Sequence, residues 1–219
     1  MDINPKIFRE YDIRGLVDKD LSEDFVEFLG RGIGTYFRRR GKREVALGRD
    51  ARLSSPAYAR AICRGLMSTG CRVVDYGLVP PPLIYFAVFH KKREASVMIT
   101  GSHNPPEYNG LKFNLETGAP ALPSETDKIE EDAARLIRCA SACAYYPRTE
   151  FVEKIDLQAD YLDYIRKKID FGAIQKSGLR IAVDPLYGTS REYLDEILEE
   201  NGIAVEEIHG YVDPYFGGI

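Results

Sequence analysis

The sequence has no unbroken apolar run long enough to cross a bilayer, and its first residues lack the basic and apolar regions of a signal peptide. We therefore expect a cytoplasmic protein without membrane contact. It also has no surplus of basic residues, because 30 lysines and arginines stand against 34 aspartates and glutamates, for a net charge of −4. This balance argues against nucleic acid as a partner, and any site for an anion has to be local.

Cysteine is scarce as well. The four cysteines show no metal-type pairing; Cys139 and Cys143 have a spacing that suits one helical face, but no histidine or second cysteine pair lies beside them. A zinc site is therefore not expected. With 44% apolar residues over 219 positions, the chain can form a core, and its length fits one large domain or one and a half ordinary ones.

The apolar segments alternate between strand-like and helix-like patterns. Strands are predicted at residues 44–48, 71–76, 95–99 and 111–115, and helices at residues 57–68, 83–90 and 124–138. Strands separated by helices favour a largely parallel sheet covered on both faces. We therefore predict an α/β fold, a layered α/β/α domain with a mostly parallel mixed sheet over residues 1–146.

The chain after residues 145–148 repeats the earlier pattern. It predicts a helix at 157–169, a strand at 179–183, a helix at 189–200 and a strand at 203–208, with Thr189 and Glu192 at capping-box spacing. Asp50 and Asp184 take equivalent places after their strands. Residues 147–219 are therefore predicted to be an incomplete second copy of a similar unit, which self-association or a complementing chain would complete because two strands alone are marginal.

The predicted strand at residues 95–99 leads into residues 100–107, which read T-G-S-H-N-P-P-E. In open α/β sheets, ligands collect beyond the carboxyl ends of such strands. Gly101 adds backbone freedom, and the two prolines stop a helix or ladder from continuing. We predict a rigid turn that exposes the hydroxyl of Ser102.

Phosphoryl transfer suits a serine of this kind. The reaction needs an in-line nucleophile and positive charge around three oxygens, and Lys112, on the polar face of its strand, and Arg14 are the candidate cations. A hydrolase is disfavoured because the adjacent Ser102 and His103 rarely face each other and no G-x-S-x-G elbow surrounds the serine.

Several of these residues also have structural interpretations. A serine in an isolated S-x-N-P loop more often bonds its own backbone, and His103 stays open between general acid–base catalysis and tethering the loop. Arg49 and Arg52 are a candidate phosphate fork. The sequence nevertheless favours an ion pair between Arg49 and its neighbour Asp50, which leaves Arg49 as an alternative site residue.

Four ordered segments together resemble the α-D-phosphohexomutases, the phosphomannomutase/phosphoglucomutase family. They are E-Y-D-I-R-G at 10–15, G-R-D-x-R-x-S at 48–54, T-G-S-H-N-P at 100–105 and Y-N-G-x-K at 108–112. With all four motifs present in order, we favour the functional interpretation of Ser102 over the turn-forming one.

The resemblance implies interconversion of hexose 1-phosphate and hexose 6-phosphate through a phosphoserine at Ser102, with hexose 1,6-bisphosphate as intermediate and activator. It implies Mg²⁺ with an oxygen of that phosphoserine among its ligands. The implied catalytic residues are Ser102, His103, Lys112 and Arg14.

Substrate contacts are implied for Arg49 and for Tyr11, which either packs on the sugar or closes the amino-terminal segment. Mannose and glucose phosphates are the favoured substrates, because T-G-S-H-N-P fits that branch better than the T-A-S-H-N form associated with phosphoglucosamine mutases, which remain an alternative.

The family has four domains, and this sequence resembles the first and about half of the second. The acidic D-G-D-G-D metal loop, the sugar-selecting loop and the phosphate-binding loop have no counterpart in these 219 residues. We therefore expect the remaining Mg²⁺ ligands outside this chain and no appreciable mutase turnover from the chain alone. The alternative of a different class is a truncated product or phosphoacceptor module that acts with a partner.

Overall fold

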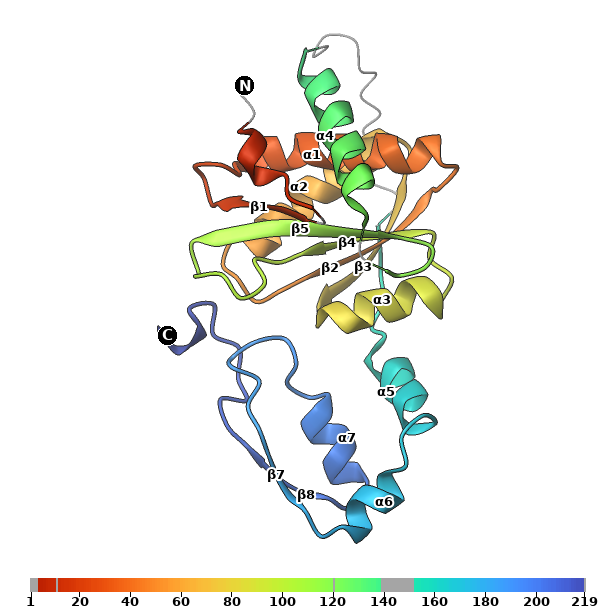
Figure 1. Ribbon diagram of the computed structural model, residues 1–219, viewed down its shortest axis with the longest axis vertical. Helices are drawn as coiled ribbons and strands as arrows, with labels where there is room; N and C mark the ends of the chain where they lie inside the picture. The colour runs from red at the N-terminus through yellow and green to blue at the C-terminus, as the bar shows by residue number, and fades with distance from the viewer. Residues whose placement is uncertain (1–3, 11, 120, 139–151, 219) are drawn as a thin grey trace.

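The computed structural model describes residues 4–10, 12–119, 121–138 and 152–218. Its larger sheet is built from β1 (Asp12–Leu16), β2 (Glu44–Arg49), β3 (Arg72–Leu78), β4 (Ala95–Ile99), β5 (Tyr108–Leu115) and β6 (Val152–Lys154). The strand order is β1-β5-β4-β2-β3-β6 (Figure 1). Strands β4, β2, β3 and β6 run parallel, and β5 is antiparallel to both β4 and β1. The predicted mostly parallel mixed sheet is confirmed.

Helices cover both faces of this sheet (Figure 1). One face carries α1 (Glu23–Arg39), α2 (Ser55–Ser68) and α4 (Pro123–Arg138), and the other carries α3 (Pro81–Phe89). Alternation along β4 explains the two layers, because Val97 and Ile99 join the core under α1 and α2 while Met98 joins the core under α3. No helix within the described ranges is both long and apolar enough to cross a membrane.

The predicted elements of this part all occur within three residues of their expected bounds. The sequence did not predict three further elements, α1, β1 and β6. The predicted domain boundary at 146–147, like Cys139 and Cys143, lies outside the described residues. Strand β6 follows that boundary and pairs in parallel with β3, so the chain returns to the first sheet before it continues.

The second part of the chain is smaller. It consists of α5 (Gln158–Arg166), α6 (Phe171–Lys176), the parallel pair β7 (Arg180–Val183) and β8 (Ala204–Glu207), and α7 (Leu194–Glu200). Short 3-10 turns lie at Pro5–Ile7 and Phe216–Gly218. Aromatic contacts join the two parts, since the Phe86 ring of α3 lies 5.2 Å from the Tyr161 ring and 5.3 Å from the Tyr164 ring of α5.

Two helix predictions in the second part need correction. The helix expected at 157–169 ends at Arg166, because Asp170 begins a new helix by accepting the backbone N–H of Ala173 at 3.0 Å. The helix expected at 189–200 begins only at Leu194. Its first turn is closed by Asp195, which accepts the N–H groups of Glu192 and Tyr193, both at 3.0 Å, so the predicted capping box is wrong.

The start of β2 gives a prediction for acid stability. Glu94 accepts the backbone N–H groups of Glu44 at 2.7 Å and Arg43 at 2.6 Å, and these bonds hold the pKa of its carboxyl below the ordinary value of 4.5. A lowered folded-state pKa means that the stabilisation is complete above pH 4.5 and is lost as the pH falls below it. We expect Glu94→Gln to lower the unfolding free energy at pH 7 and to flatten its fall below pH 4.5.

Urea unfolding at pH 7, 4 and 3 measures this effect. The control is Glu131→Gln, an exposed position on α4. If Glu94→Gln and Glu131→Gln follow the same pH dependence as the unaltered protein, the assignment to Glu94 is wrong.

Candidate active site

The turn that joins β4 to β5 exposes Ser102 on a constrained backbone. Ser102 has a φ of +58°, a left-handed conformation that is uncommon for a residue with a side chain. Its backbone N–H donates to Thr100 Oγ1 at 2.9 Å, and the N–H of Asn104 donates to the carbonyl of Gly101 at 3.1 Å. The side chains of Ser102 and His103 are exposed, and Ser102 Oγ lies 3.5 Å from His103 Nδ1. The hydroxyl is thus free for chemistry, with one titratable group beside it.

Arg52 lies beneath this turn and is only 2% exposed. Its Nη1 donates to the carbonyl oxygens of Pro105 at 2.6 Å and Tyr108 at 2.9 Å. Its Nη2 donates to the carbonyl oxygens of Ser102 at 3.0 Å and Asn104 at 2.6 Å. One guanidinium therefore binds four carbonyl groups between residues 102 and 108.

Asp50 balances the charge of this arginine and extends the network. One carboxylate oxygen accepts Arg52 Nε at 3.1 Å and the N–H of Gly101 at 3.2 Å. The other accepts the N–H of Arg52 at 3.1 Å and the hydroxyl of Ser55, at the start of α2, at 2.6 Å. The carboxylate thus connects the turn to both β2 and α2.

The predicted ion pair between Arg49 and Asp50 is wrong, since Asp50 pairs with Arg52. The predicted phosphate fork of Arg49 and Arg52 is also not supported, because the donors of Arg52 are already engaged by backbone carbonyls and Asp50. Arg49 is half-buried at the end of β2. Tyr11 lies outside the described residues.

The two predicted cations lie on neighbouring strands, the edge strand β1 and the adjacent β5. Arg14 of β1 is buried and pairs with Asp12 at 2.5 Å, so its charge is balanced within the same strand. Lys112 of β5 is half-buried and stands opposite Asp12 on one side and Met98 on the other. Within the described residues Lys112 has no ion pair, so it is the cation of this group left to meet an anion.

Close packing fixes the position of these strands. A Cβ atom on Gly110 would lie 2.2 Å from the carbonyl oxygen of Ile13, 3.1 Å from that of Thr100 and 3.3 Å from the Cα of Arg14, all of them backbone atoms. We expect Gly110→Ala to lower the unfolding free energy by about 3 kcal/mol, because β1 and β5 have to separate to accommodate the methyl group.

Urea unfolding of this variant beside Gly172→Ala measures the effect. The control adds a methyl group in α6 where the nearest atom is Asp170 Oδ1 at 3.3 Å, and we expect it to change stability by less than about 1 kcal/mol. Equal stability of the two variants would contradict the tight β1–β5 packing.

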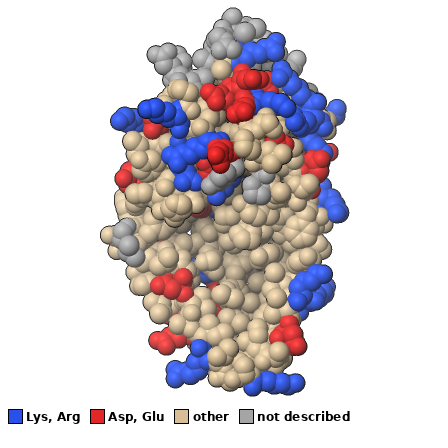
Figure 2. Space-filling view, in the orientation of Figure 1, with Lys and Arg blue, Asp and Glu red and all other residues tan. Residues whose placement is uncertain are grey.

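An open cavity of about 690 Å³ lies beside the turn. Residues of the first part line one wall, among them Ser102, His103 and Pro80, and residues of the second part line the other, among them Leu186 and Ser190. Arg14, Arg49 and Lys112 are not among the lining residues. Figure 2 shows a hollow between the upper and lower parts bordered mostly by uncharged residues, while charged side chains gather over the upper part.

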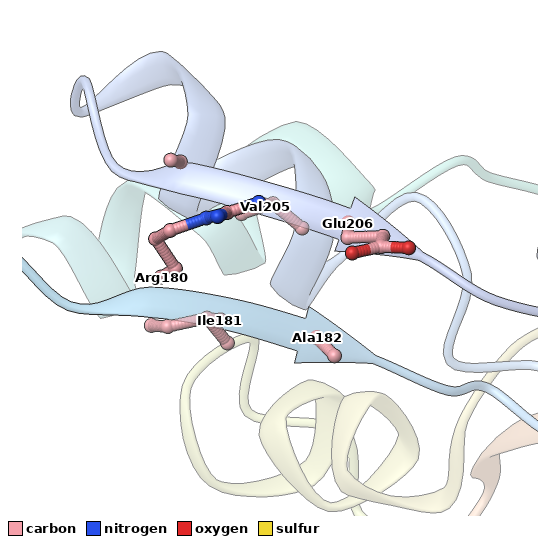
Figure 3. A pocket seen from close by; sticks show the side chains of 6 residues that line it. Arg180, Ile181, Ala182, Val205 and Glu206 are labelled. Carbon is pink, nitrogen blue, oxygen red and sulfur yellow. The ribbon is translucent and has the colours of Figure 1, made fainter.

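A second cavity, of about 400 Å³, lies against one face of β7 and β8 (Figure 3). Arg180 and Glu206 are its charged lining residues, and the others are Ile181, Ala182, Ala204 and Val205. None of the predicted site residues lies there. We therefore place the candidate active site at the Ser102 turn.

The metal implied by the sequence can be tested against the side chains present. Within the described ranges, no group of three or more His, Cys, Asp or Glu side chains could hold a metal ion. Asp50, the carboxylate beside the turn, is engaged by Arg52, Ser55 and Gly101. These residues do not by themselves form a Mg²⁺ site, so no step of the reaction is derived through the metal.

Sequence comparisons match both parts of the chain. The model described as "Phosphoglucomutase/phosphomannomutase, alpha/beta/alpha domain I" matches residues 5–137, and the corresponding domain II model matches residues 159–219. A phosphoglucomutase/phosphomannomutase of Thermococcus kodakarensis is 32% identical over 96% of this chain and 46% of its own length. A phosphoglucomutase of Neisseria gonorrhoeae is 36% identical over 98% of this chain and 44% of its own length.

Other similar proteins include one with a different mutase name and one with a solved structure. A "probable phosphoglucosamine mutase" of Methanopyrus kandleri is 34% identical over 97% of this chain and 45% of its own length. A phosphoglucomutase/phosphomannomutase family protein of Burkholderia thailandensis has a similar solved structure, with a TM-score of 0.83 and 28% identity over 98% of this chain and 46% of that one. The chain thus spans less than half the length of these relatives.

Proposed function

The chain belongs to the phosphoglucomutase/phosphomannomutase family, and on that premise we propose that Ser102 carries a phosphoryl group exchanged with a hexose phosphate. The relatives are named mutases, so the family is one of isomerases. The proposed overall reaction interconverts hexose 1-phosphate and hexose 6-phosphate through a hexose 1,6-bisphosphate. Because the chain spans less than half of its relatives, this overall reaction is proposed for the whole protein.

The proposal rests on one observation, the exposed Ser102 hydroxyl on a turn whose backbone is tied down on the inner side. In the forward half-reaction, the bond between phosphorus and Ser102 Oγ breaks as a bond forms from a hydroxyl oxygen of the sugar. Such a reaction depends on positioning and on positive charge more than on covalent chemistry by the protein. A fixed turn beside an open cavity supplies the positioning.

Proton balance gives His103 a part in this step. The attacking sugar hydroxyl loses a proton and the released Ser102 oxygen gains one, and His103 Nδ1 lies 3.5 Å from that oxygen. We propose that His103 serves as the general base and acid for this exchange. The second half-reaction returns the other phosphoryl group of the bisphosphate to Ser102 and completes the isomerisation.

The names of the relatives support a class of substrate and do not identify one compound. They are named for glucose, mannose and glucosamine phosphates, so hexose phosphate is the shared class. We propose glucose and mannose phosphates as the first choice because of the T-G-S-H-N-P sequence at the turn. Arg49 and Tyr11 are proposed to contact the sugar phosphate from neighbouring segments, and Mg²⁺ is proposed to bind an oxygen of phosphorylated Ser102.

Phosphoryl uptake by the purified chain tests this function. The protein is incubated separately with the 1,6-bisphosphates of glucose, mannose and glucosamine, each with Mg²⁺ and with EDTA, and phosphate is located by peptide mass spectrometry. We expect phosphate on Ser102, Mg²⁺-dependent and fastest with the glucose or mannose compound. Fastest uptake from the glucosamine compound would favour the phosphoglucosamine branch, and no uptake from any donor would overturn the proposal for this chain.

A second assay on the same samples distinguishes an enzyme from a phosphoacceptor module. A coupled assay for glucose 6-phosphate formed from glucose 1-phosphate reports complete turnover, alone and with a candidate complementing chain. Uptake on Ser102 without turnover under either condition would favour the module, and turnover that depends on Ser102 would favour the enzyme.

A further inference from the structure

The buried guanidinium of Arg52 has an unusual set of partners. Its two Nη atoms donate to four carbonyl oxygens that all belong to the active-site turn, between residues 102 and 108, at 2.6 to 3.0 Å. In sequence these partners lie 50 to 56 residues away. The arginine comes from the segment between β2 and α2, so it connects the turn to a different part of the fold.

These contacts decide which way the turn faces. Carbonyl groups that converge on a single centre beneath the turn fix the peptide plane that follows Ser102 and the plane that follows Asn104, because each plane carries its carbonyl and the next N–H together. The left-handed backbone of Ser102, with φ at +58°, is one that a residue with a side chain holds only when its surroundings determine it. The inward carbonyls therefore hold the serine with its side chain on the outer, exposed side.

The partners of Arg52 also keep it from moving outward to a substrate. Asp50 accepts from Nε at 3.1 Å, and the side chain is 1% exposed. Gly101 packs directly against the guanidinium, since a Cβ atom there would lie 2.5 Å from Arg52 Cζ. The Phe216 ring, from the second part of the chain, lies 5.2 Å from the same Cζ. The group is enclosed beneath the turn.

Lysine cannot replace this arrangement. A guanidinium presents five donors in a fixed planar fork, whereas an ammonium presents three donors from a single point. Lysine at this position would keep the positive charge near Asp50 but would leave several of the four carbonyls without a donor. The site therefore requires arginine, because it uses both the planar shape and the charge of the guanidinium.

We propose that Arg52 is a positioning residue that orients Ser102 for phosphoryl transfer by binding the inner side of its turn. This inference rests on the proposed function of Ser102 and adds the means by which the serine is held. Arg52 is among the residues that line the cavity, but its donors are already engaged by Asp50 and the four carbonyls, and its side chain is 1% exposed. The proposal therefore predicts that Arg52 affects the rate of transfer and leaves the binding of the phosphate donor largely unchanged.

Three variants test the proposal. Arg52→Lys keeps the charge and removes the fork, Arg52→Ala leaves a space for added guanidinium ion, and Gly101→Ala pushes on the guanidinium without removing it. The control is Arg93→Lys, which alters a half-buried arginine paired with Glu44 and Tyr76 near the other end of β2. Two readouts are needed: amide hydrogen exchange of residues 101–108, and the rate of Ser102 phosphorylation over a range of bisphosphate concentrations.

We expect faster amide exchange in the turn for Arg52→Lys and Gly101→Ala, and a maximal phosphorylation rate lower by about 10- to 100-fold with a nearly unchanged half-saturating concentration. Millimolar guanidinium, far below denaturing concentrations, should raise the phosphorylation rate of Arg52→Ala several-fold. It should leave the rate of the Arg93→Lys control unchanged. The Gly101→Ala variant decides the matter if the Arg52 variants do not fold.

The opposite results overturn the inference. A raised half-saturating concentration with an unchanged maximal rate would make Arg52 a ligand of the phosphate. If amide exchange and the phosphorylation rate are both unchanged in Arg52→Lys, the turn keeps its conformation without the guanidinium. If the unaltered protein takes up no phosphate, the proposed function fails, while the exchange data still decide whether Arg52 orders the turn.

Discussion

Replacing Ser102 with alanine is expected to abolish phosphoryl uptake from a hexose 1,6-bisphosphate completely, while the protein stays folded. The hydroxyl is the proposed acceptor, and no other atom of the residue can replace it. Folding should be preserved because the bonds that hold Ser102 are made by its backbone: the N–H donates to Thr100 and the carbonyl accepts from Arg52. Alanine keeps both. Peptide mass spectrometry after incubation with Mg²⁺ and donor measures uptake, and urea unfolding measures stability.

Two other serines serve as matched controls. Ser54 lies at the start of α2, where its hydroxyl accepts from Asn109 Nδ2 at 2.8 Å, and Ser190 lines the opposite wall of the cavity. We expect Ser54→Ala and Ser190→Ala to leave uptake on Ser102 intact. Phosphate found on Ser54 or Ser190 in the unaltered protein, with none on Ser102, would overturn the assignment of the acceptor.

The strand before Ser102 and the turn itself were predictable because their signals are local. Five successive residues in Ala95–Ile99 are buried, and such a run followed by glycine and two prolines gives a strand that must end in a turn. Asp50 and Asp184 were likewise predicted to occupy equivalent positions. Both follow a strand and accept the N–H of the residue two places on, at 3.1 Å for Arg52 and 2.8 Å for Leu186.

The role of Arg52 was not predictable, because its partners are distant in the sequence. The G-R-D-x-R motif shows two arginines near one aspartate, and adjacency favoured Arg49 as the partner of Asp50. The observed pair is Arg52 with Asp50, since the aspartate also has to bind Gly101 and Ser55. Only the packing of β4 beside β2 brings the four carbonyls of the turn over Arg52.

The helix α1 was missed for a different reason, its glycine content. Gly30, Gly32 and Gly34 lie within it, and glycine in a helix interior costs about 1 kcal/mol relative to alanine. The structure explains their presence through close packing: a Cβ on Gly30 would lie 3.0 Å from the carbonyl oxygen of Ile62, and one on Gly34 would lie 2.3 Å from Thr69 Oγ1. Tertiary packing thus outweighs local propensity.

Lys112 is the side chain best placed to bring positive charge to Ser102 in the proposed reaction. Lys112 stands opposite Met98, four residues before Ser102 on β4, and the carbonyl of Gly110 accepts the N–H of Thr100 at 3.0 Å. Lys112 is therefore two residues along β5 from Gly110, which pairs with Thr100 at the start of the turn, and two residues span about 7 Å, close to the reach of an extended lysine side chain. Arg14 is nearby on β1, but Asp12 already balances its charge.

A phosphorylated Ser102 would carry about −1.5 to −2 charges at neutral pH, and the transition state spreads this charge over three oxygens. Losing one well-placed cationic donor from such a site typically costs about two to three powers of ten in rate. We therefore expect Lys112→Met, which keeps the aliphatic stem, to slow phosphoryl uptake by about 100- to 1,000-fold with little change in stability. Lys112→Arg should fall between that variant and the unaltered protein.

Single-turnover uptake, measured at two salt concentrations, decides the matter. The rate of the unaltered protein should fall as salt screens Lys112 from the phosphate, and the rate of Lys112→Met should depend less on salt. Lys154→Met, on the exposed edge strand β6 of the same sheet, is the matched control and should behave like the unaltered protein. If Lys112→Met stays within about threefold of the control, well below the expected loss, the cation must be another group. Arg14 is the next candidate on these strands: it would have to leave Asp12 during the reaction, and Asp12→Asn would then speed uptake by releasing it.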